Sequence, residues 1–245
     1  MKTIVLAAGY ATRLYPLTEN FPKPLLEIGN NTILGRLLDD IDGIDEIDEH
    51  ILVTNEKFSG IFEDWAFQRR RKNPRPVLVL SDGTLTNETR LGAVKDLILA
   101  LNVYAIDEDV LVLAADNILD FSLKGFVEEF HKKRTSMIMC HHEPELYKLQ
   151  RTGVIAVDEN MKVLQMQEKP ERPVSHWAVP PFYIYAKEDL PMIRVALAHG
   201  CGADAPGNLA HYVADHSVLH AWPMPAGRFD IGSLDTYEIA KQKYL

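Results

Sequence analysis

Two cations follow the first apolar segment of the chain, where they could bind phosphate oxygens. Residues 3–7 read TIVLA, a run typical of a buried parallel strand. The long loop after it begins near Gly9, and small residues in such a turn let backbone N–H groups approach phosphates. Arg13 can hold phosphate oxygens with two N–H groups, and Lys23 adds a compact charge. The loop therefore suits a triphosphate, although an ordinary loop could carry the same cations at its surface.

The spacing within this loop excludes two common nucleotide sites. It lacks the G-x-G-x-x-G pattern of dinucleotide-binding proteins. It also lacks the G-x-x-x-x-G-K-[ST] pattern of P-loop ATPases. A glycine turn with one arginine and one lysine is what remains.

Two aspartates stand where they could bind a metal ion. Asp116 follows the apolar run VLVLAA, and the carboxyl ends of strands are where ligands collect in α/β proteins. Asp230 lies far away in the sequence, within RFDIG. Mg²⁺ usually takes one or two carboxylates and completes its shell with phosphate oxygens and water. Both aspartates could instead be ordinary turn or cap residues, because turns are where Asp commonly occurs.

A resemblance to a known family favours the functional interpretation. The stretch LAAGYATRLYPLTENFPKPLLEIG is similar to the signature of the sugar-phosphate nucleotidyltransferases, and further pieces recur in the expected order: Gly92, the ADN that contains Asp116, the EKP at Glu168 to Pro170, and the FDIG that contains Asp230. The resemblance implies an enzyme that joins a nucleotide to a sugar 1-phosphate and uses Mg²⁺. It also implies a fold, an α/β Rossmann-like and mostly parallel sheet sandwiched by helices, with a mixed α/β sugar-binding lobe.

The same resemblance assigns roles to individual residues. It makes Arg13 and Lys23 catalytic, and Asp116 and Asp230 the metal ligands. The expected nucleotide-binding residues are Leu6, Ala7, Ala8, Gly9 and Gly92, and the expected sugar-phosphate-binding residues are Gly153, Glu168 and Lys169.

The chain departs from the family pattern at two places. Ala11 replaces the second glycine of the loop, and alanine tolerates positive φ poorly, so we expect a slightly reshaped turn that still binds. Residues 179–182 read VPPF where the family usually has a small or amide residue before an aromatic strand. This second departure leaves the sugar open, and nothing in the sequence selects the base.

Alternating apolar and helical patterns over the first half predict parallel βαβ units. After about residue 143 the pattern becomes mixed, with a hairpin signal at residues 158–160. We therefore expect a single domain over residues 1–245, with a nucleotide-binding lobe at about 1–142 and a sugar-phosphate lobe at about 143–245.

The charge and composition of the chain argue against a nucleic-acid-binding protein and a membrane protein. A net charge of −9 argues against a nucleic-acid partner, and the basic run at residues 69–72 is expected on a solvated helix face. The seven-residue apolar stretch at the start is too short for a signal peptide or a membrane span, so a cytoplasmic protein without a membrane partner is expected. The two cysteines form no metal or redox motif. A homo-oligomer is left open.

Two other functions stay open from the sequence. The altered residues 179–182 keep a non-sugar acceptor such as phosphocholine in view. A catalytically inert regulatory relative is the other alternative. Such a protein should lose an aspartate or a cation of the site, but this chain keeps Arg13, Lys23, Asp116, Lys169 and Asp230.

Overall fold

The structure, a computed structural model, describes residues 1–244, and the chain divides into two compact units. Unit 1 comprises Met1–Leu91, Ala114–Lys124 and Ala226–Leu245, and unit 2 comprises Gly92–Leu113 and Gly125–Pro225. The units therefore interleave along the chain, whereas the two expected lobes are continuous. The assignment of one substrate to each lobe stays a prediction.

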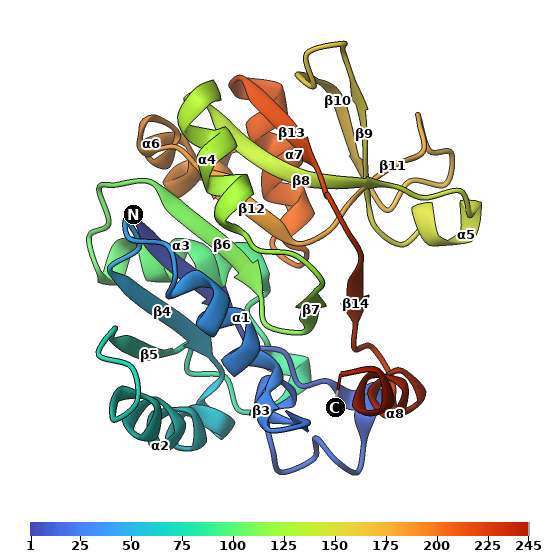
Figure 1. Cartoon of the computed structure of the whole chain (residues 1–245). Helices are drawn as coiled ribbons and strands as arrows, with labels where there is room; N and C mark the ends of the chain where they lie inside the picture. Colours follow the sequence, from blue (N-terminus) through green and yellow to red (C-terminus); the bar gives the residue numbers. More distant parts are fainter. Residues whose placement is uncertain (245) are drawn as a thin grey trace. The chain divides into compact units, whose positions relative to one another are not determined.

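Three parallel strands form the centre of unit 1 (Figure 1). They are β1 (Lys2–Leu6), β4 (Glu49–Thr54) and β5 (Val77–Ser81), with β1 and β5 each paired to β4. Their apolar runs lack polar alternation, as expected for strands that helices cover. Parallel strands end at the same edge of a sheet, so the loop after β1 emerges beside the loops that follow β4 and β5.

The helices of unit 1 are α1 (Ile33–Ile41), α2 (Ser59–Arg70) and α8 (Leu234–Lys243). Side chains cap the starts of α1 and α8, whereas α2 has no side-chain cap. At the start of α1 the Thr32 hydroxyl accepts a hydrogen bond from the Gly35 N–H at 2.9 Å. Four short strands complete the unit: β2 (Glu27–Ile28), β3 (Asn31–Thr32), β7 (Asn117–Leu119) and β14 (Arg228–Asp230).

Unit 2 is built on a mixed sheet in the order β10-β9-β11-β8-β12-β6, with β13 parallel to β8. The strands are β6 (Val110–Ala114), β8 (Ser136–His142), β9 (Gly153–Val157), β10 (Val163–Glu168), β11 (Trp177–Val179), β12 (Phe182–Tyr185) and β13 (Leu219–Pro223). Its helices are α3 (Ala93–Val103), α4 (Lys124–Lys133), α5 (Leu146–Leu149), α6 (Leu190–Val195) and α7 (Pro206–His216). The expected α/β class is confirmed, and the hairpin predicted at residues 158–160 joins β9 to β10.

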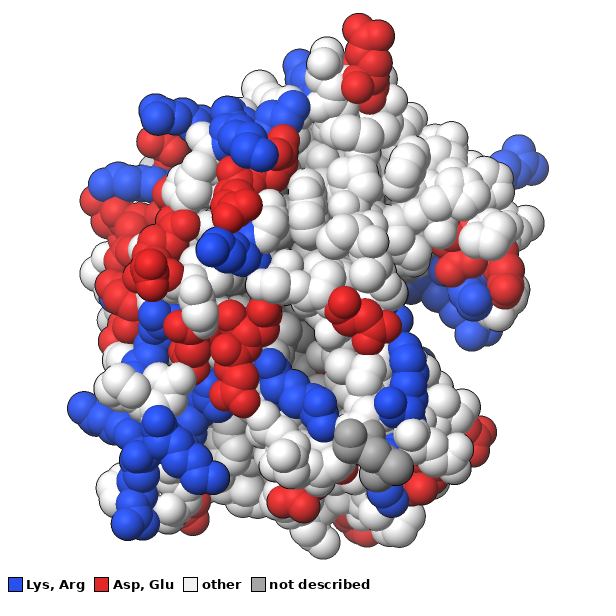
Figure 2. Space-filling view, in the orientation of Figure 1, with Lys and Arg blue, Asp and Glu red and all other residues white. Residues whose placement is uncertain are grey.

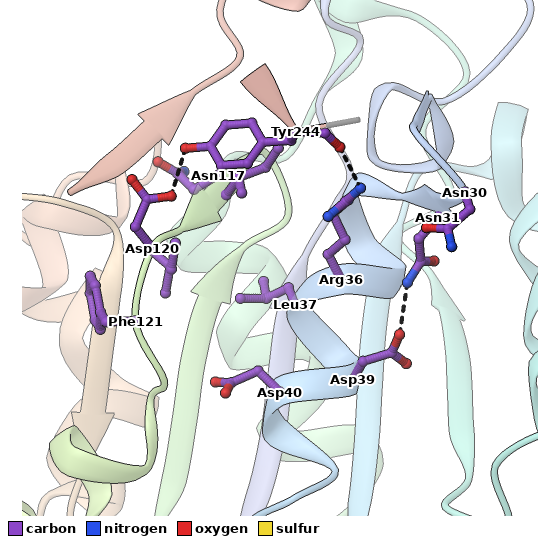
Figure 3. Close-up of a pocket in the computed structure, with 12 residues that line it drawn as sticks. Asn30, Asn31, Arg36, Leu37, Asp39, Asp40, Asn117, Asp120, Phe121 and Tyr244 are labelled. Atoms are coloured by element: carbon purple, nitrogen blue, oxygen red, sulfur yellow. Dashed lines mark hydrogen bonds between the residues drawn. The ribbon is translucent and has the colours of Figure 1, made fainter. Parts of the chain in front are cut away.

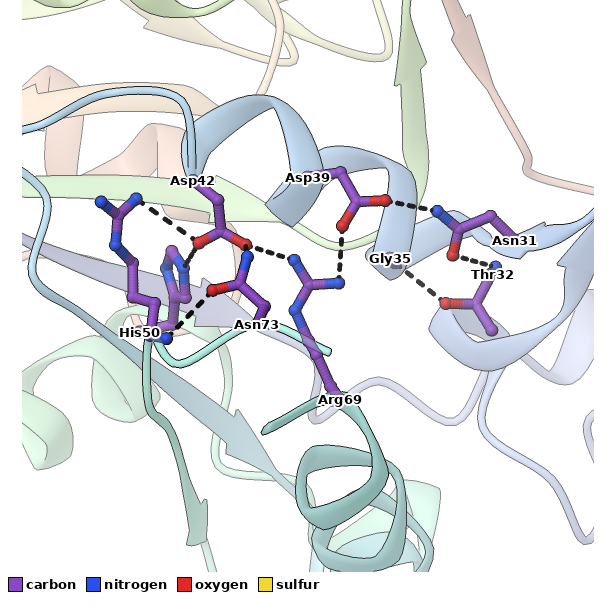
Figure 4. A network of polar contacts seen from close by, with 9 residues as sticks. Asn31, Thr32, Gly35, Asp39, Asp42, His50, Arg69 and Asn73 are labelled. Carbon is purple, nitrogen blue, oxygen red and sulfur yellow. Dashed lines mark hydrogen bonds and ion pairs between the residues drawn. The ribbon is translucent and has the colours of Figure 1, made fainter. Parts of the chain in front are cut away.

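The basic run at residues 69–72 does not lie wholly on a solvated face. Lys and Arg side chains gather over α2 (Figure 2), but the Arg69 side chain is only 9% exposed. It forms ion pairs with Asp39 at 2.8 Å and Asp42 at 2.5 Å (Figure 4). Asp42 also binds the buried His50 ring at 2.8 Å and contacts Asn73. The prediction was wrong for Arg69, because α1 presents acidic side chains to that side of α2.

No helix in the described part of the chain has the length and apolar character needed to cross a bilayer.

Candidate functional site

The loop after β1 is fixed by contacts with the neighbouring parallel strand. The Ala7 N–H donates to the Val53 carbonyl at 2.8 Å, which continues the sheet by one residue. The Asn55 side chain donates to the Ala8 carbonyl at 3.1 Å, while its oxygen accepts from the Phe58 N–H. One buried amide thus ties the loop to the turn after β4.

A cavity of about 160 Å³ lies against this loop in unit 1. It includes three of the expected nucleotide-binding residues, Leu6, Ala7 and Gly9, whereas Ala8 is not part of the wall. The other lining residues are Ala11, Lys23, Pro24, Ala114, Ala115 and Asp116. The cavity is smaller than the range of about 300–1,000 Å³ typical of ligand sites.

Ala11 adopts the glycine-like conformation that the family signature suggests. Its φ of 46° and ψ of 42° lie in the left-handed region, where an alanine is strained. The Ala11 carbonyl accepts the buried Thr18 hydroxyl at 2.8 Å and the Leu14 N–H at 2.9 Å. The turn is therefore held in place despite the missing glycine.

Two short paired strands bring the aspartates together. β7 and β14 are antiparallel, and Asp230 lies opposite Asn117 in their register. One residue further along, the Ile231 N–H donates to the Asp116 carbonyl at 3.1 Å. Two carboxylates more than a hundred positions apart in sequence thereby become neighbours within unit 1.

Burial and neighbouring positive charges act in opposite directions on the pKa of Asp230. Burial raises the pKa of Asp230, and the negative charge of Asp116 raises it further. The positive charges of Lys23, Arg228 and Arg13 lower this pKa but do not cancel the increase. The Lys23 ammonium lies 2.9 Å from Asp116 Oδ2, with its side chain only 11% exposed. An additional cation would relieve the remaining repulsion between the carboxylates.

The donor set fits a magnesium ion better than a metal held wholly by side chains. Among residues 1–244, no group of three or more His, Cys, Asp or Glu side chains could hold a metal ion. Two carboxylates are enough for Mg²⁺, which completes its shell with water and phosphate oxygens. Asp116 and Asp230 therefore remain the residues expected to hold it.

Two polar residues of this site were missed by sequence reasoning. The Asn117 amide donates to Asp116 Oδ1 at 2.7 Å, and Arg228 Nη1 donates to Asn117 Oδ1 at 2.6 Å. This chain of hydrogen bonds fixes the orientation of the Asp116 carboxylate. Arg228 could have been found, because residues two apart in a strand share a face and Arg228 precedes Asp230 by two positions.

The expected acceptor residues meet on adjacent strands of unit 2. Gly153 on β9 lies between Glu168 on β10 and Val179 on β11. A Cβ at Gly153 would lie 3.2 Å from Met166 Cε, 3.2 Å from Val179 Cβ and 3.3 Å from Glu168 Oε2. The glycine therefore leaves room that a side chain would take from the Glu168 carboxylate.

Glu168 and Lys169 differ in burial although they are adjacent. The Glu168 side chain is 14% exposed, and burial raises its pKa, with the Lys169 charge acting in the opposite direction. The Lys169 side chain is 53% exposed, and its ammonium lies 3.9 Å from Glu168 Oε1. Lys169 has a φ of 48°, and its N–H donates to the Thr152 carbonyl at 3.0 Å. A lysine in the left-handed region is the kind of backbone outlier that gathers at functional sites.

Gly92 opens helix α3 in a conformation that requires glycine. Its φ is 97°, and a Cβ there would lie 2.5 Å from the Ala203 carbonyl oxygen. The neighbouring N–H groups of Ala93 and Val94 donate to the carbonyls of Asp204 and Ala203. Gly92 thus lets the backbone of residues 203–204 pack directly on the start of α3.

The structure brings the predicted residues together in two groups. Lys23, Asp116 and Asp230 form one group in unit 1, and Arg13 belongs to the same unit with an exposed side chain. Gly153, Glu168 and Lys169 form the second group, in unit 2, which also contains Gly92.

A larger cavity in unit 1 contains none of the predicted site residues. It measures about 410 Å³ and lies between α1 and the strand β7 (Figure 3). Several of its polar groups bind one another: Arg36 donates to the Tyr244 carbonyl at 2.8 Å, and the Tyr244 hydroxyl donates to Asp120 at 2.8 Å. Arg36 and Asp120 are thus engaged with the terminal helix.

Comparison with known proteins gives matches over the whole chain. A family model described as nucleotidyl transferase matches residues 2–245. A UTP–glucose-1-phosphate uridylyltransferase of Haloferax volcanii is 25% identical, over 99% of this chain and 96% of that protein. A glucose-1-phosphate adenylyltransferase of Fervidobacterium nodosum is also 25% identical, over 96% of this chain and 59% of that protein.

A solved structure has the same fold. The structure of a UDP-glucose pyrophosphorylase complexed with UDP-glucose superposes with a TM-score of 0.81 and 21% identity. The match covers 99% of this chain and 97% of that chain.

Proposed function

Since the chain belongs to the nucleotidyl transferase family, we propose that it transfers a nucleotidyl group from a nucleoside triphosphate to a sugar 1-phosphate, giving an NDP-sugar and pyrophosphate. The observation that carries this proposal is the group formed by Lys23, Asp116 and Asp230 beside the loop after β1. The relatives' names support the sugar 1-phosphate as acceptor. They differ in the base, so the base of the triphosphate stays open.

In the proposed reaction an oxygen of the acceptor phosphate attacks the α-phosphorus of the triphosphate. The new P–O bond replaces the bond to the bridging oxygen, and pyrophosphate leaves with that electron pair. The acceptor phosphate is already ionised near neutral pH, so a general base is not required. Positioning and charge neutralisation therefore carry the catalysis.

The cations of unit 1 would act on the triphosphate. Lys23 is largely buried and aimed at the carboxylates, so its charge is applied in a poorly solvated place, where electrostatic stabilisation is strong. Arg13 is exposed and free to reach phosphate oxygens as negative charge moves to the leaving group. Asp116 and Asp230 would hold Mg²⁺, which when bound neutralises phosphate oxygens.

The residues of unit 2 would take the acceptor. Lys169 carries an exposed ammonium that could bind the acceptor phosphate and offset the repulsion between the two anions. Glu168 could accept hydrogen bonds from hydroxyl groups, because among residues 1–244 its carboxylate has no hydrogen-bond or ion-pair partner closer than the Lys169 ammonium at 3.9 Å. Gly153 would let the acceptor approach the sheet at this point.

A substrate screen tests the proposal. Each common nucleoside triphosphate is combined with a set of sugar 1-phosphates and with phosphocholine, in the presence of Mg²⁺, and pyrophosphate release is measured. Release that depends on a sugar 1-phosphate is expected. Release with phosphocholine alone would replace the acceptor class, and no release from any combination would favour an inert regulatory relative.

A further inference from the structure

One glycine in unit 2 lies in direct contact with the carboxylate that the proposed function assigns to the acceptor. A Cβ built at Gly207 would lie 1.9 Å from Glu168 Oε2 and 2.8 Å from Glu168 Cδ. Apart from the chain neighbours of Gly207 and the backbone of its own helix, the three described heavy atoms nearest to this point all belong to Glu168. Gly207 and Glu168 are 39 positions apart, so tertiary packing alone creates the contact.

The backbone conformation does not explain the glycine. Gly207 is the second residue of α7, and its φ lies outside the positive range that L side chains rarely adopt. Alanine is the better helix former, so a helical glycine needs a reason in packing or function. The contact with the Glu168 carboxylate supplies such a reason.

The backbone that carries Gly207 is anchored and cannot easily retreat. Residues 203–204 are held against the start of α3 by the two hydrogen bonds from Ala93 and Val94, and a Gly92 Cβ would meet the Ala203 oxygen. The Asn208 N–H donates to the Ala205 carbonyl at 3.0 Å, which closes the first turn of α7. An added methyl group at Gly207 must therefore displace the flexible end of Glu168.

We infer that Gly207 is a specificity-determining position that acts through Glu168: its missing side chain lets the carboxylate lie against the first turn of α7 and fixes where the carboxylate oxygens meet the acceptor. Gly207 is thus a positioning residue. The inference rests on the proposed function, because it takes Glu168 as the residue that binds acceptor hydroxyl groups. It predicts that acceptor selection can be changed from α7, an element outside the sequence motifs.

The test is a double-mutant cycle with G207A and E168A. Acceptor kinetics are measured with the sugar 1-phosphate that supports turnover in the screen above, with glucose 1-phosphate as the first probe. G207A should raise the acceptor KM about ten- to a hundredfold, the range expected for loss of a hydrogen bond to a charged group. Nucleotide affinity, measured by calorimetry, should stay within about twofold of the wild-type value. In the E168A background, G207A should change the acceptor KM by less than about twofold, because the clashing group is gone.

A second measurement and a control keep the outcomes distinct. Thermal unfolding should show that G207A lowers the melting temperature in the wild type more than in E168A. The control is G60A on α2, where an added Cβ meets nothing within 4 Å and kinetics should not change.

Three outcomes would overturn the inference, in two different ways. Equal effects of G207A in the wild-type and E168A backgrounds would refute the role of Gly207. An unchanged acceptor KM in G207A, together with impaired acceptor kinetics in E168A, would do the same. Either result would leave the acceptor role of Glu168 intact. Normal acceptor kinetics in E168A would refute the acceptor role of Glu168 and with it the proposed site.

Discussion

Replacing Lys169 by glycine should lower activity without a comparable loss of stability. Lys169 has a φ of 48°, and a non-glycine residue in the left-handed region costs about 1–2 kcal/mol. Glycine removes this cost, but it also lowers the stability by about 0.5–1 kcal/mol because it increases the entropy of the unfolded chain. The Lys169–Glu168 pair is 3.9 Å long with the lysine 53% exposed, so its loss costs less than about 1 kcal/mol. These terms nearly cancel, so Lys169→Gly should stay within about 1.5 kcal/mol of the wild-type stability.

The activity of the same variant should fall. If Lys169 binds the acceptor phosphate, its removal loses a charged hydrogen bond of about 1.5–3 kcal/mol. The corresponding decrease in kcat/KM for the acceptor is about ten- to a hundredfold. Nucleotide affinity should not change, because Lys23 and the aspartates of unit 1 are untouched.

The assay combines three measurements on one preparation: thermal unfolding, acceptor kinetics by pyrophosphate release, and nucleotide binding by calorimetry. Lys169→Ala serves as the matched control, since it removes the same ammonium but keeps a strained residue. It should lose the same activity and be less stable than Lys169→Gly. Normal acceptor kinetics in both variants would return Lys169 to the solvated surface, and a glycine variant less stable than the alanine variant would refute the backbone argument.

Three further predictions concern unit 1. Asp116→Asn or Asp230→Asn should lower turnover at least a hundredfold, because a lost metal contact costs several kcal/mol in the transition state; a variant folded by circular dichroism that keeps half its activity would contradict this. Lys23→Ala should weaken triphosphate binding and turnover together by about ten- to a hundredfold, and calorimetry showing unchanged nucleotide affinity with unchanged turnover would contradict the assignment. Asp42→Asn should lower the free energy of unfolding at pH 7 by about 3–5 kcal/mol, because buried cations lose their partner, whereas Asp39→Asn, on a side chain that is 55% exposed, should cost less than about 1 kcal/mol; similar urea midpoints for the two variants would show the network to be unimportant.

The network around Asp42 also gives a sign for the pH dependence of stability. Burial acts to raise the pKa of Asp42, but the hydrogen bond and charge of His50 and the charge of Arg69 outweigh burial and leave this pKa lowered. A lowered carboxyl pKa contributes stability above the unfolded value, and this stability is lost as the pH falls through the folded value. The difference between the wild type and Asp42→Asn should therefore shrink below about pH 4.

The secondary-structure elements that could be predicted are those with a strong local pattern of apolar residues. The apolar run before Asp116 forms strand β6, Val110–Ala114, because a continuous buried run has few alternatives. Helix α7 gives a weaker local signal, because it begins with a proline and a glycine. Residues 187–199 do not form one continuous α-helix: the α-helical part is Leu190–Val195, with Pro191 in its first turn, and 3₁₀ turns flank it.

The site residues that lie in sequence motifs could be predicted. The contacts that depend on tertiary pairing of distant segments could not. Asp116 and Asp230 were singled out from motifs, but nothing local indicates that β7 and β14 pair, since each has three residues. The contact of Arg228 with Asn117 joins residues 111 positions apart. Gly207 belongs to no motif of the sequence, and its role follows from its contact with Glu168 in the folded chain.

The interleaving of the two units has a consequence for how the protein is made. Asp116 and Asp230 belong to the same unit, yet nearly all of the chain between them, residues 125–225, belongs to the other. During synthesis the carboxylate pair cannot form until unit 2 has been completed and β14 has followed it. A nascent chain that stops within residues 125–225 carries Lys23 and Asp116 without their partner. Under the proposed function, metal-dependent activity would become available only after both units have been translated.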